Sequence, residues 1–251
     1  MRTITTALAT LISLTYAISL LAQDTSPAKQ LSQNPVKPVQ SATAPKWLKG
    51  MPVEDQRKLR GLLGDAATYL KGIRVQEAFE KILEAEALAP EYSVIHNLKG
   101  AAYTKIREFD KATAAFTKAL ELDPASFMCR FNLTEMNFVK GRFDEAEKGF
   151  RQLINDQPSL PEANKALIQF KILICRLKQG DEPGARAILK NWDFLDDHPS
   201  FYFGNAAIHF NKDDSDGART WLSSAKKIYP QSAINLYTDS FIEIGWIENF
   251  E

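Results

Sequence analysis

The sequence predicts an all-α solenoid of antiparallel helix pairs, and three observations carry this prediction. First, Pro90, Pro124 and Pro158 are spaced by 34 residues and again by 34. Second, an alanine precedes each of these prolines by twelve residues. Third, large apolar residues recur between them at steps of three and four, which is the spacing of one helix face. Small, large and proline positions that share one period indicate an internal repeat.

Residues 125–158 show how one repeat is expected to fold. Side chains that step by three and four from Phe127 to Asn137 mark one face of a first helix. Gly141 then provides the backbone freedom that ends this helix, and Asp144 is expected to cap a second one. In the second helix a small alanine lets the two backbones approach, and Phe150 fills the space between successive pairs. Such a unit cannot bury both of its faces alone, so the units are expected to stack.

This pattern resembles the tetratricopeptide repeat family. The agreement is best in residues 93–126, where six of the family's eight signature positions are filled and two differ. The six are Gly100, Tyr103, Ala112, Phe116, Ala119 and Pro124, whereas His96 and Lys99 stand where the family prefers Trp and Leu. The resemblance implies a right-handed superhelical solenoid over residues 46–251.

Five repeat units and a final helix are expected within this solenoid. The units lie near residues 59–92, 93–126, 127–160, 161–198 and 199–232, and a capping helix follows over 233–250. The first three units match the family pattern well, whereas the last two are degenerate. Gly180 arrives five residues late relative to Pro158, so the first helix that opens at Pro161 is expected to be longer by more than a turn.

Residues 1–22 are predicted to form a secretory signal peptide, since Arg2 is their only charge and the others are apolar or small. Cleavage is expected after Ala22, with Ala17 as the competing site. An uncleaved membrane anchor is the alternative, because about 20 uncharged residues can just span a bilayer. Residues 23–45 hold four prolines and many Ser, Thr and Gln, which predicts a flexible tether. The protein is therefore expected to be exported, and to be periplasmic or secreted.

The 31 basic and 31 acidic side chains cancel, which argues against nucleic acid or an anionic membrane surface as the main partner. The charges are nevertheless placed unevenly. Residues 46–75 carry seven Lys or Arg against three Asp or Glu, and residues 228–251 carry four acids and no basic residue. A basic head and an acidic tail at opposite ends of a solenoid predict head-to-tail self-association.

We find no catalytic or metal-binding motif in the sequence. His96 and His209 fall at positions that the family packs with Trp and Tyr, so a packing role is expected for both. His198 lies in an Asp-rich turn, but no second histidine has the spacing of a metal site. Cys129 and Cys175 are predicted to be free thiols, because their helices should offset them by more than a disulfide permits. We therefore expect no cofactor, no metal and no enzymatic activity.

The resemblance implies that the first helices line a groove whose outward positions contact partner peptides. These positions are Val94, Asn97, Ala101, Thr104 and Lys105 in one unit, and Met128, Phe131, Glu135, Phe138 and Val139 in the next. Four of them, Met128, Phe131, Phe138 and Val139, form an apolar patch that predicts a groove for an apolar peptide or helix. Alternatively, the long helix from Pro161 or the tether covers this patch. The carboxylate clamp of some family members is absent, since only Asn132 fits it.

The final helix is apolar on more than one side. It carries Tyr237, Phe241 and Ile244 on one side, and Ile242 and Trp246 on another. Terminal repeats normally need a polar outer face. Part of this helix must therefore pack under the last pair, and the remainder predicts a surface for a partner or for self-association.

Together these features predict an exported, non-enzymatic scaffold or adaptor that mediates protein–protein interactions in the bacterial cell envelope. The binding role is what the resemblance implies, because periodicity predicts only the architecture. One alternative is a structural subunit of a secretion or outer-membrane assembly, fixed in place by the apolar C-terminal helix. Another is an enzyme or a small-ligand-binding protein that uses the turn around His198.

Overall fold

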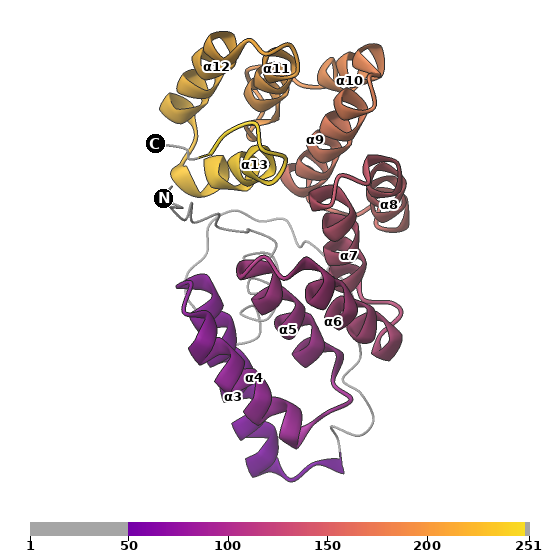
Figure 1. Cartoon of the computed structure of the whole chain (residues 1–251), viewed down its shortest axis with the longest axis vertical. Helices are drawn as coiled ribbons and strands as arrows, with labels where there is room; N and C mark the ends of the chain where they lie inside the picture. Colours follow the sequence, from indigo (N-terminus) through magenta and orange to yellow (C-terminus); the bar gives the residue numbers. More distant parts are fainter. Residues whose placement is uncertain (1–49, 249–251) are drawn as a thin grey trace, which may run out of the picture. The chain divides into compact units, whose positions relative to one another are not determined.

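The computed structural model describes residues 50–248, which form helices joined by short connections (Figure 1). Within this range there are eleven α-helices and no β-strand. They are α3 (Val53–Lys71), α4 (Val75–Leu88), α5 (Ser93–Lys105), α6 (Phe109–Leu122), α7 (Phe127–Val139), α8 (Phe143–Asp156), α9 (Glu162–Lys178), α10 (Glu182–Leu189), α11 (Ser200–Phe210), α12 (Ser215–Ile228) and α13 (Gln231–Glu243). Ten helices form five consecutive pairs and α13 follows alone, so the predicted all-α fold of five pairs and a final helix is confirmed.

The described residues form two compact units, and the boundary between the units lies inside α7. The N-terminal unit comprises residues 50–132, with α3 to α6 and the start of α7. The C-terminal unit comprises residues 133–248, with the rest of α7 and α8 to α13. Inside each unit, successive helices pack on one another to make the core.

Small residues at the pair contacts let the helix backbones approach, as the repeat pattern predicts. Ala78, Ala112 and Ala146 have no exposed surface. A Cβ atom added to Gly100 would lie 2.5 Å from the ring of Phe116, so the missing side chain makes room for this ring between α5 and α6. The small positions of the repeat are therefore fixed by packing.

A left-handed residue occurs in the turn between the two helices of every pair. Gly141 (φ 74°) and Gly180 (φ 83°) are glycines, but the other three are Ile73 (φ 60°), Arg107 (φ 61°) and Asp213 (φ 58°). Glycine adopts this conformation without a steric penalty, whereas residues with a Cβ atom do not. The geometry of the helix pair therefore imposes the conformation even where the sequence provides no glycine.

Side-chain caps are found at two of the second helices. Asp181 and Asp214 cap α10 and α12, each by accepting a hydrogen bond of 2.9 Å from the N–H of the glycine three residues later. The predicted cap at Asp144 is wrong, because Arg142 takes the N-cap position of α8. The Asp144 carboxylate instead accepts a hydrogen bond of 2.8 Å from Nε2 of Gln179, in the turn after α9.

The long helix α9 agrees with the length expected from the repeat, whereas α13 is shorter than expected. α9 has 17 residues and is longer than the first helices α5, α7 and α11, as predicted. α13 ends at Glu243, well before the expected end at residue 250, because Gly245 (φ 74°) turns the backbone out of the helix.

The predicted signal peptide, residues 1–22, and the predicted tether, residues 23–45, lie outside the described residues. Among the helices of residues 50–248, none combines the length and the apolar character that crossing a membrane requires.

Candidate functional site

The inner face of the N-terminal unit, made by α5 and the start of α7, carries a pair of asparagines. Nδ2 of Asn132 donates a hydrogen bond of 2.7 Å to Oδ1 of Asn97, and Sγ of Cys129 lies 3.8 Å from the same oxygen. Both asparagines are buried, with 3% and 7% of their surface exposed. Oδ1 of Asn132 is also buried and has no hydrogen-bond partner among the described residues. The pair therefore contains one amide acceptor that the unit itself does not satisfy.

The other predicted groove residues of the N-terminal unit lie on the same two helices, α5 and α7. Val94, Lys105 and Met128 are half-buried, and Ala101 is buried. Thr104 is buried as well, and its hydroxyl donates to the carbonyl of Gly100 on its own helix. Phe131 is 8% exposed and stacks on Phe127, with ring centroids 6.3 Å apart. The structure brings Asn97 together with Asn132, and a binding role for these residues stays a prediction.

Phe138 and Glu135 lie in the C-terminal unit and are not surface residues there. Phe138 has no exposed surface, and its ring lies edge-on to Phe143 and Phe150 with centroid distances of 5.9 and 6.2 Å. Glu135 is 3% exposed, and Val139 is half-buried. The predicted apolar patch is therefore wrong for Phe138, because this side chain packs toward α8, the second helix of its own pair.

A buried ionic cluster joins α7, α9 and α13 of the C-terminal unit. Nζ of Lys171 lies 3.0 Å from Oε1 of Glu135 and 3.6 Å from Oε2 of Glu243. It donates a hydrogen bond of 2.9 Å to Oγ of Ser240 and lies 4.9 Å from the ring centroid of Phe138. Sequence reasoning missed this lysine. The signal was a single cation within the apolar run of residues 166–175, where an unpaired charge would be costly.

The electrostatics of the cluster are dominated by burial and by an excess of carboxylates. Burial acts to lower the pKa of Lys171, but Glu135 and Glu243 outweigh it, so this pKa is raised. Burial, together with Glu135 and Asp239, raises the pKa of Glu243 to about 8 against the opposing effect of Lys171. The carboxyl of Glu243 therefore keeps its proton at neutral pH, which limits the negative charge around one ammonium group.

The predicted acidic tail, residues 228–251, is partly buried. Asp239 is 6% exposed and the side chain of Glu243 is 5% exposed, so two of the four acids of residues 228–251 are internal. They belong to the cluster around Lys171 and do not form an exposed acidic patch. At most two of the four acids therefore remain available for the predicted head-to-tail attraction.

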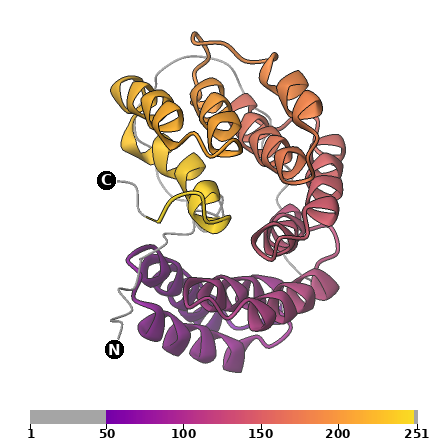
Figure 2. The same cartoon turned by 45° about the horizontal axis from the view of Figure 1, so that its top comes forward.

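The predicted C-terminal surface residues Tyr237 and Phe241 lie within the core of the C-terminal unit, at 2% and 0% exposed. The hydroxyl of Tyr237 is hydrogen-bonded to Oγ of Ser200 on α11 at 2.7 Å. The ring of Phe241 lies 5.6 Å from that of Phe170 on α9 and 5.6 Å from that of Phe203 on α11. Figure 2 shows α13 on the inner side of the arc that the pairs from α7 to α12 trace.

The segment after α13 continues this packing. Trp246 stacks on Phe210 of α11 with centroids 5.9 Å apart, and Nζ of Lys178 lies 4.5 Å from the centroid of the Trp246 ring. Ile244 is half-buried at the end of the helix. The apolar residues of the C-terminal helix are thus used mainly inside their own unit.

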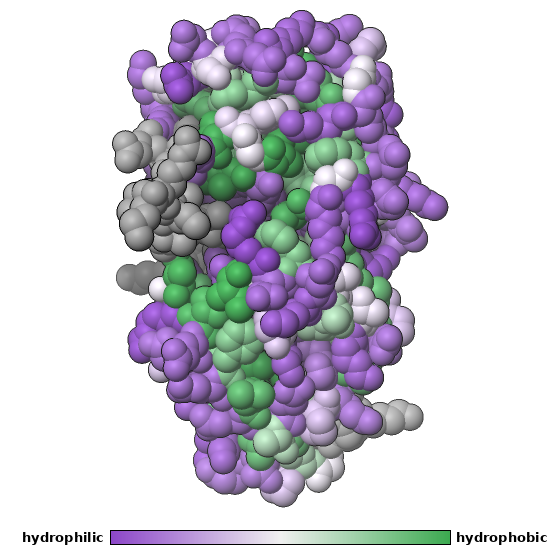
Figure 3. Space-filling model, viewed as in Figure 1, coloured by the Kyte–Doolittle hydropathy of each residue, from purple (hydrophilic) through white to green (hydrophobic). Residues whose placement is uncertain are grey.

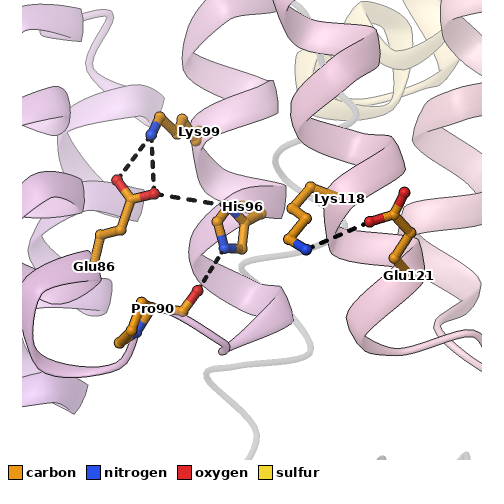
Figure 4. A network of polar contacts seen from close by, with 6 residues as sticks. All are labelled: Glu86, Pro90, His96, Lys99, Lys118 and Glu121. Carbon is orange, nitrogen blue, oxygen red and sulfur yellow. Dashed lines mark hydrogen bonds and ion pairs between the residues drawn. The ribbon is translucent and has the colours of Figure 1, made fainter.

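His96 links the first two helix pairs (Figure 4). Its Nε2 lies 2.8 Å from the carbonyl oxygen of Pro90, and its Nδ1 lies 3.9 Å from Oε1 of Glu86. Nζ of Lys99 lies 2.8 Å from the other oxygen of Glu86, which ties α5 to α4. His96 is 8% exposed, so the expected packing role fits its position.

The remaining histidines and the cysteines do not assemble a reactive site. The side chain of His209 is 37% exposed and its Nδ1 lies 2.7 Å from Oδ2 of Asp214, so its expected core position is wrong and it supports the cap of α12. His198 is buried beside Trp192. Both cysteines are free and buried, as predicted. Within residues 50–248 no group of three His, Cys, Asp or Glu could hold a metal ion.

Exposed apolar side chains are found away from the inner faces. In the view of Figure 3, hydrophobic residues are visible along α3 and α4 of the N-terminal unit, where Leu83 is 56% exposed. In the C-terminal unit, Phe194 and Leu195 are 63% and 75% exposed in the connection between α10 and α11. Single exposed apolar residues are ordinary in proteins. Among the three residues named here, only Phe194 and Leu195 are adjacent in sequence.

Comparison with protein families identifies one of these helix pairs. Residues 93–126, which contain α5 and α6, match the family model of the tetratricopeptide repeat. The chain contains a tetratricopeptide repeat (TPR). A TPR protein from Parabacteroides merdae ATCC 43184 superimposes with a TM-score of 0.55 at 18% identity, over 73% of this chain and 71% of that one. This likeness shows that the TPR fold extends well beyond the matched repeat.

YrrB, a TPR protein with an unusual peptide-binding site, superimposes with a TM-score of 0.49 at 16% identity, over 78% of this chain and 98% of its own. No curated protein sequence matches this chain. The TPR fold suggests a scaffold for protein–protein interactions, and proteins built from TPRs are typically non-enzymatic.

Proposed function

We propose that this protein is an exported, non-enzymatic scaffold that binds another protein in the bacterial envelope through the inner face of its N-terminal unit. The TPR fold supports the binding role. The signal-like composition of residues 1–22 supports export.

The observation that carries the binding site is the unsatisfied amide oxygen of Asn132 next to Asn97. A buried acceptor without a donor costs about 1–3 kcal/mol of stability, so such atoms call for a structural or functional reason. An extended peptide has free backbone N–H groups, and one of them can donate to this buried oxygen once the side chains that cover it move aside. The half-buried side chains of Val94 and Met128 then provide apolar contacts for the same segment.

The C-terminal helix, which suggested a structural subunit as the alternative, no longer supports that hypothesis. That hypothesis required an apolar C-terminal helix available to an assembly, but Tyr237 and Phe241 are buried in their own unit. We therefore favour a binding scaffold over an assembly subunit.

Site-specific photo-crosslinking in the native envelope tests the binding site. A photoreactive residue at Val94 is expected to capture a partner, and the same residue at Lys118, whose side chain is 52% exposed on α6, is the control for the opposite helix of the repeat. Adding Asn132→Leu to the Val94 probe should reduce the capture, because leucine has no acceptor. Equal capture from both positions, or capture unaffected by Asn132→Leu, would contradict the proposal.

Export is tested separately by the mass of the protein recovered from the envelope fraction. Cleavage after Ala22 or Ala17 predicts a mature chain that begins at residue 23 or residue 18. An unprocessed chain found only in the cytosol would refute the export part and leave the binding part standing.

A further inference from the structure

The connection between α10 and α11 exposes two adjacent apolar side chains among acids. Phe194 and Leu195 are 63% and 75% exposed. Residues 193–197, which we call the acidic loop, also carry three aspartates and no basic side chain. None of these three carboxylates forms an ion pair with another residue of the described range 50–248. The loop therefore combines exposed apolar surface with uncompensated negative charge.

Hydrogen bonds hold the acidic loop in one shape. Oδ1 of Asp193 accepts a hydrogen bond of 2.7 Å from the N–H of Leu195, and Oδ2 of Asp196 accepts one of 3.0 Å from the N–H of Asp193. The carbonyl oxygen of Asp196 accepts a third, of 2.8 Å, from the hydroxyl of Tyr229 at the end of α12. A loop that is ordered before binding loses little conformational entropy when a partner docks, so its exposed side chains are suited to a contact.

Two turns of the N-terminal unit carry charge of the opposite sign. Residues 71–77 and 105–111, which we call the basic turns, carry five basic and three acidic side chains. In each of them an exposed isoleucine precedes an arginine, and Ile73 is 38% exposed and Ile106 48%. The basic turns thus also combine exposed apolar surface with charge.

The basic turns lie at one edge of the N-terminal unit. Phe79 near the start of α4 and Tyr103 near the end of α5 have ring centroids 5.0 Å apart, so the turns that adjoin these helix ends are neighbours. Two cations at this edge form no ion pair in the described part of the chain. They are Lys71, which is exposed, and Arg107, whose guanidinium lies 5.1 Å from the ring centroid of Phe109. This edge therefore provides positive charge that its own unit leaves uncompensated.

We propose that the acidic loop of one chain docks on the basic turns of a second copy of the chain. Phe194 and Leu195 cover the two exposed isoleucines, and Asp197 lies beside Lys71 and Arg107. The contact removes the apolar side chains from water, and the opposite charges fix its register. Because the two surfaces are different, the contact is heterologous, and each chain can bind one copy through its loop and another through its turns.

This contact moves the acidic side of the predicted self-association from residues 228–251 to residues 193–197. It lies outside the Asn97–Asn132 face, so its failure and the failure of the proposed function are distinguishable. One loop against two turns buries much less than the about 1,600 Å² of a standard interface, so we expect a weak contact with a Kd of about 0.1–1 mM.

Analytical ultracentrifugation of the full chain tests the contact. With a Kd of about 1 mM, the weight-average mass should be about twice that of one chain at about 1 mM protein, and close to that of one chain at about 10 μM. Raising the salt from about 20 mM to about 300 mM should weaken the association at least about threefold, because the charges are exposed. Phe194→Ser/Leu195→Ser should abolish the association. The control Leu83→Ser, which removes a 56% exposed leucine from α4, should leave it unchanged.

Charge reversal separates this contact from non-specific association and from misfolding. Asp197→Lys changes the loop, and Lys71→Glu/Arg107→Glu changes the turns. Each variant alone should self-associate at least about tenfold more weakly than the unmodified chain, because like charges then meet at the contact. An equimolar mixture of the two variants should associate again, since the intact turns of the first variant meet the intact loop of the second.

Three results would overturn the proposal. The first is a chain that stays monomeric at every concentration. If that monomer bound vesicles containing phosphatidylserine and Lys71→Glu/Arg107→Glu abolished this binding, the basic turns would be assigned to a membrane surface instead. The second is self-association that the loop and turn substitutions leave unchanged. The third is a mixture of the two charge variants that stays monomeric where the unmodified chain associates.

Discussion

Lys171 is the only cation of the buried cluster, so Lys171→Met tests whether the cluster holds the C-terminal unit together. The substitution keeps the apolar stem but leaves the carboxyl of Glu135 without the ammonium group 3.0 Å away. Keeping a glutamate neutral at pH 7 costs about 3.7 kcal/mol, since its ordinary pKa is about 4.3 and each pH unit is worth about 1.36 kcal/mol. We therefore expect Lys171→Met to lower the free energy of unfolding by about 4 kcal/mol at pH 7. At pH 5 the loss should shrink to about 1 kcal/mol by the same reasoning.

Urea unfolding followed by tryptophan fluorescence measures this loss. Three of the four tryptophans, Trp192, Trp221 and Trp246, lie in the C-terminal unit, so the signal reports mainly on it. The control is the double variant Lys171→Met/Glu135→Gln, which removes the orphaned charge and should recover most of the stability. A loss below about 1 kcal/mol at pH 7, or a loss equal at pH 5 and pH 7, would refute the electrostatic argument.

Three further predictions concern pH, packing and thiol reactivity. The raised pKa of Glu243 makes the folded state bind more protons than the unfolded state between about pH 4.5 and about 8. The free energy of unfolding should therefore fall as the pH rises through this window, by at most about 1.4 kcal/mol per pH unit. Urea titrations at several pH values should show this slope, and Glu243→Gln should flatten it. Gly100→Ala should destabilise the N-terminal unit by about 1–3 kcal/mol in thermal unfolding, because its Cβ would lie 2.5 Å from the Phe116 ring. The control Gly64→Ala, with no atom within 4 Å, should stabilise α3 by about 0.5–1 kcal/mol. Burial raises the pKa of both cysteine thiols. A thiol reagent at pH 8 should therefore modify the native chain slowly and the urea-unfolded chain at once. Rapid modification of the native chain would contradict this prediction.

The architecture could be predicted because it follows from local spacing. A proline every 34 residues, with alanine and phenylalanine in register, determines where each helix pair begins and where its backbones approach. The burial of Ala112 and the contact between Gly100 and Phe116 follow from the same pattern. Free cysteines were predicted for a related reason, since helix lengths alone separate the two positions.

The environment of the groove residues could not be predicted in the same way. Phe138 occupies a position that the resemblance assigns to the groove, yet its ring faces Phe143 and Phe150. A helix position has an inward or outward side only once its neighbours are placed, and a small rotation moves a side chain from one to the other. The asparagine pair could be predicted in part from the sequence. Asn97 and Asn132 are nearly one repeat apart, and stacked repeats bring such positions together.

The sequence by itself determined the helix pairs, because each depends on contacts between residues close along the chain. Only the tertiary structure decided that α13 lies against α9 and α11, and that Lys171 meets Glu135 from α7 and Glu243 from α13. These residues are far apart in the sequence and share no period, so no local pattern links them. Burial decides their pairing, since an ammonium group removed from water requires carboxyl groups beside it, and only the packed helices can supply them.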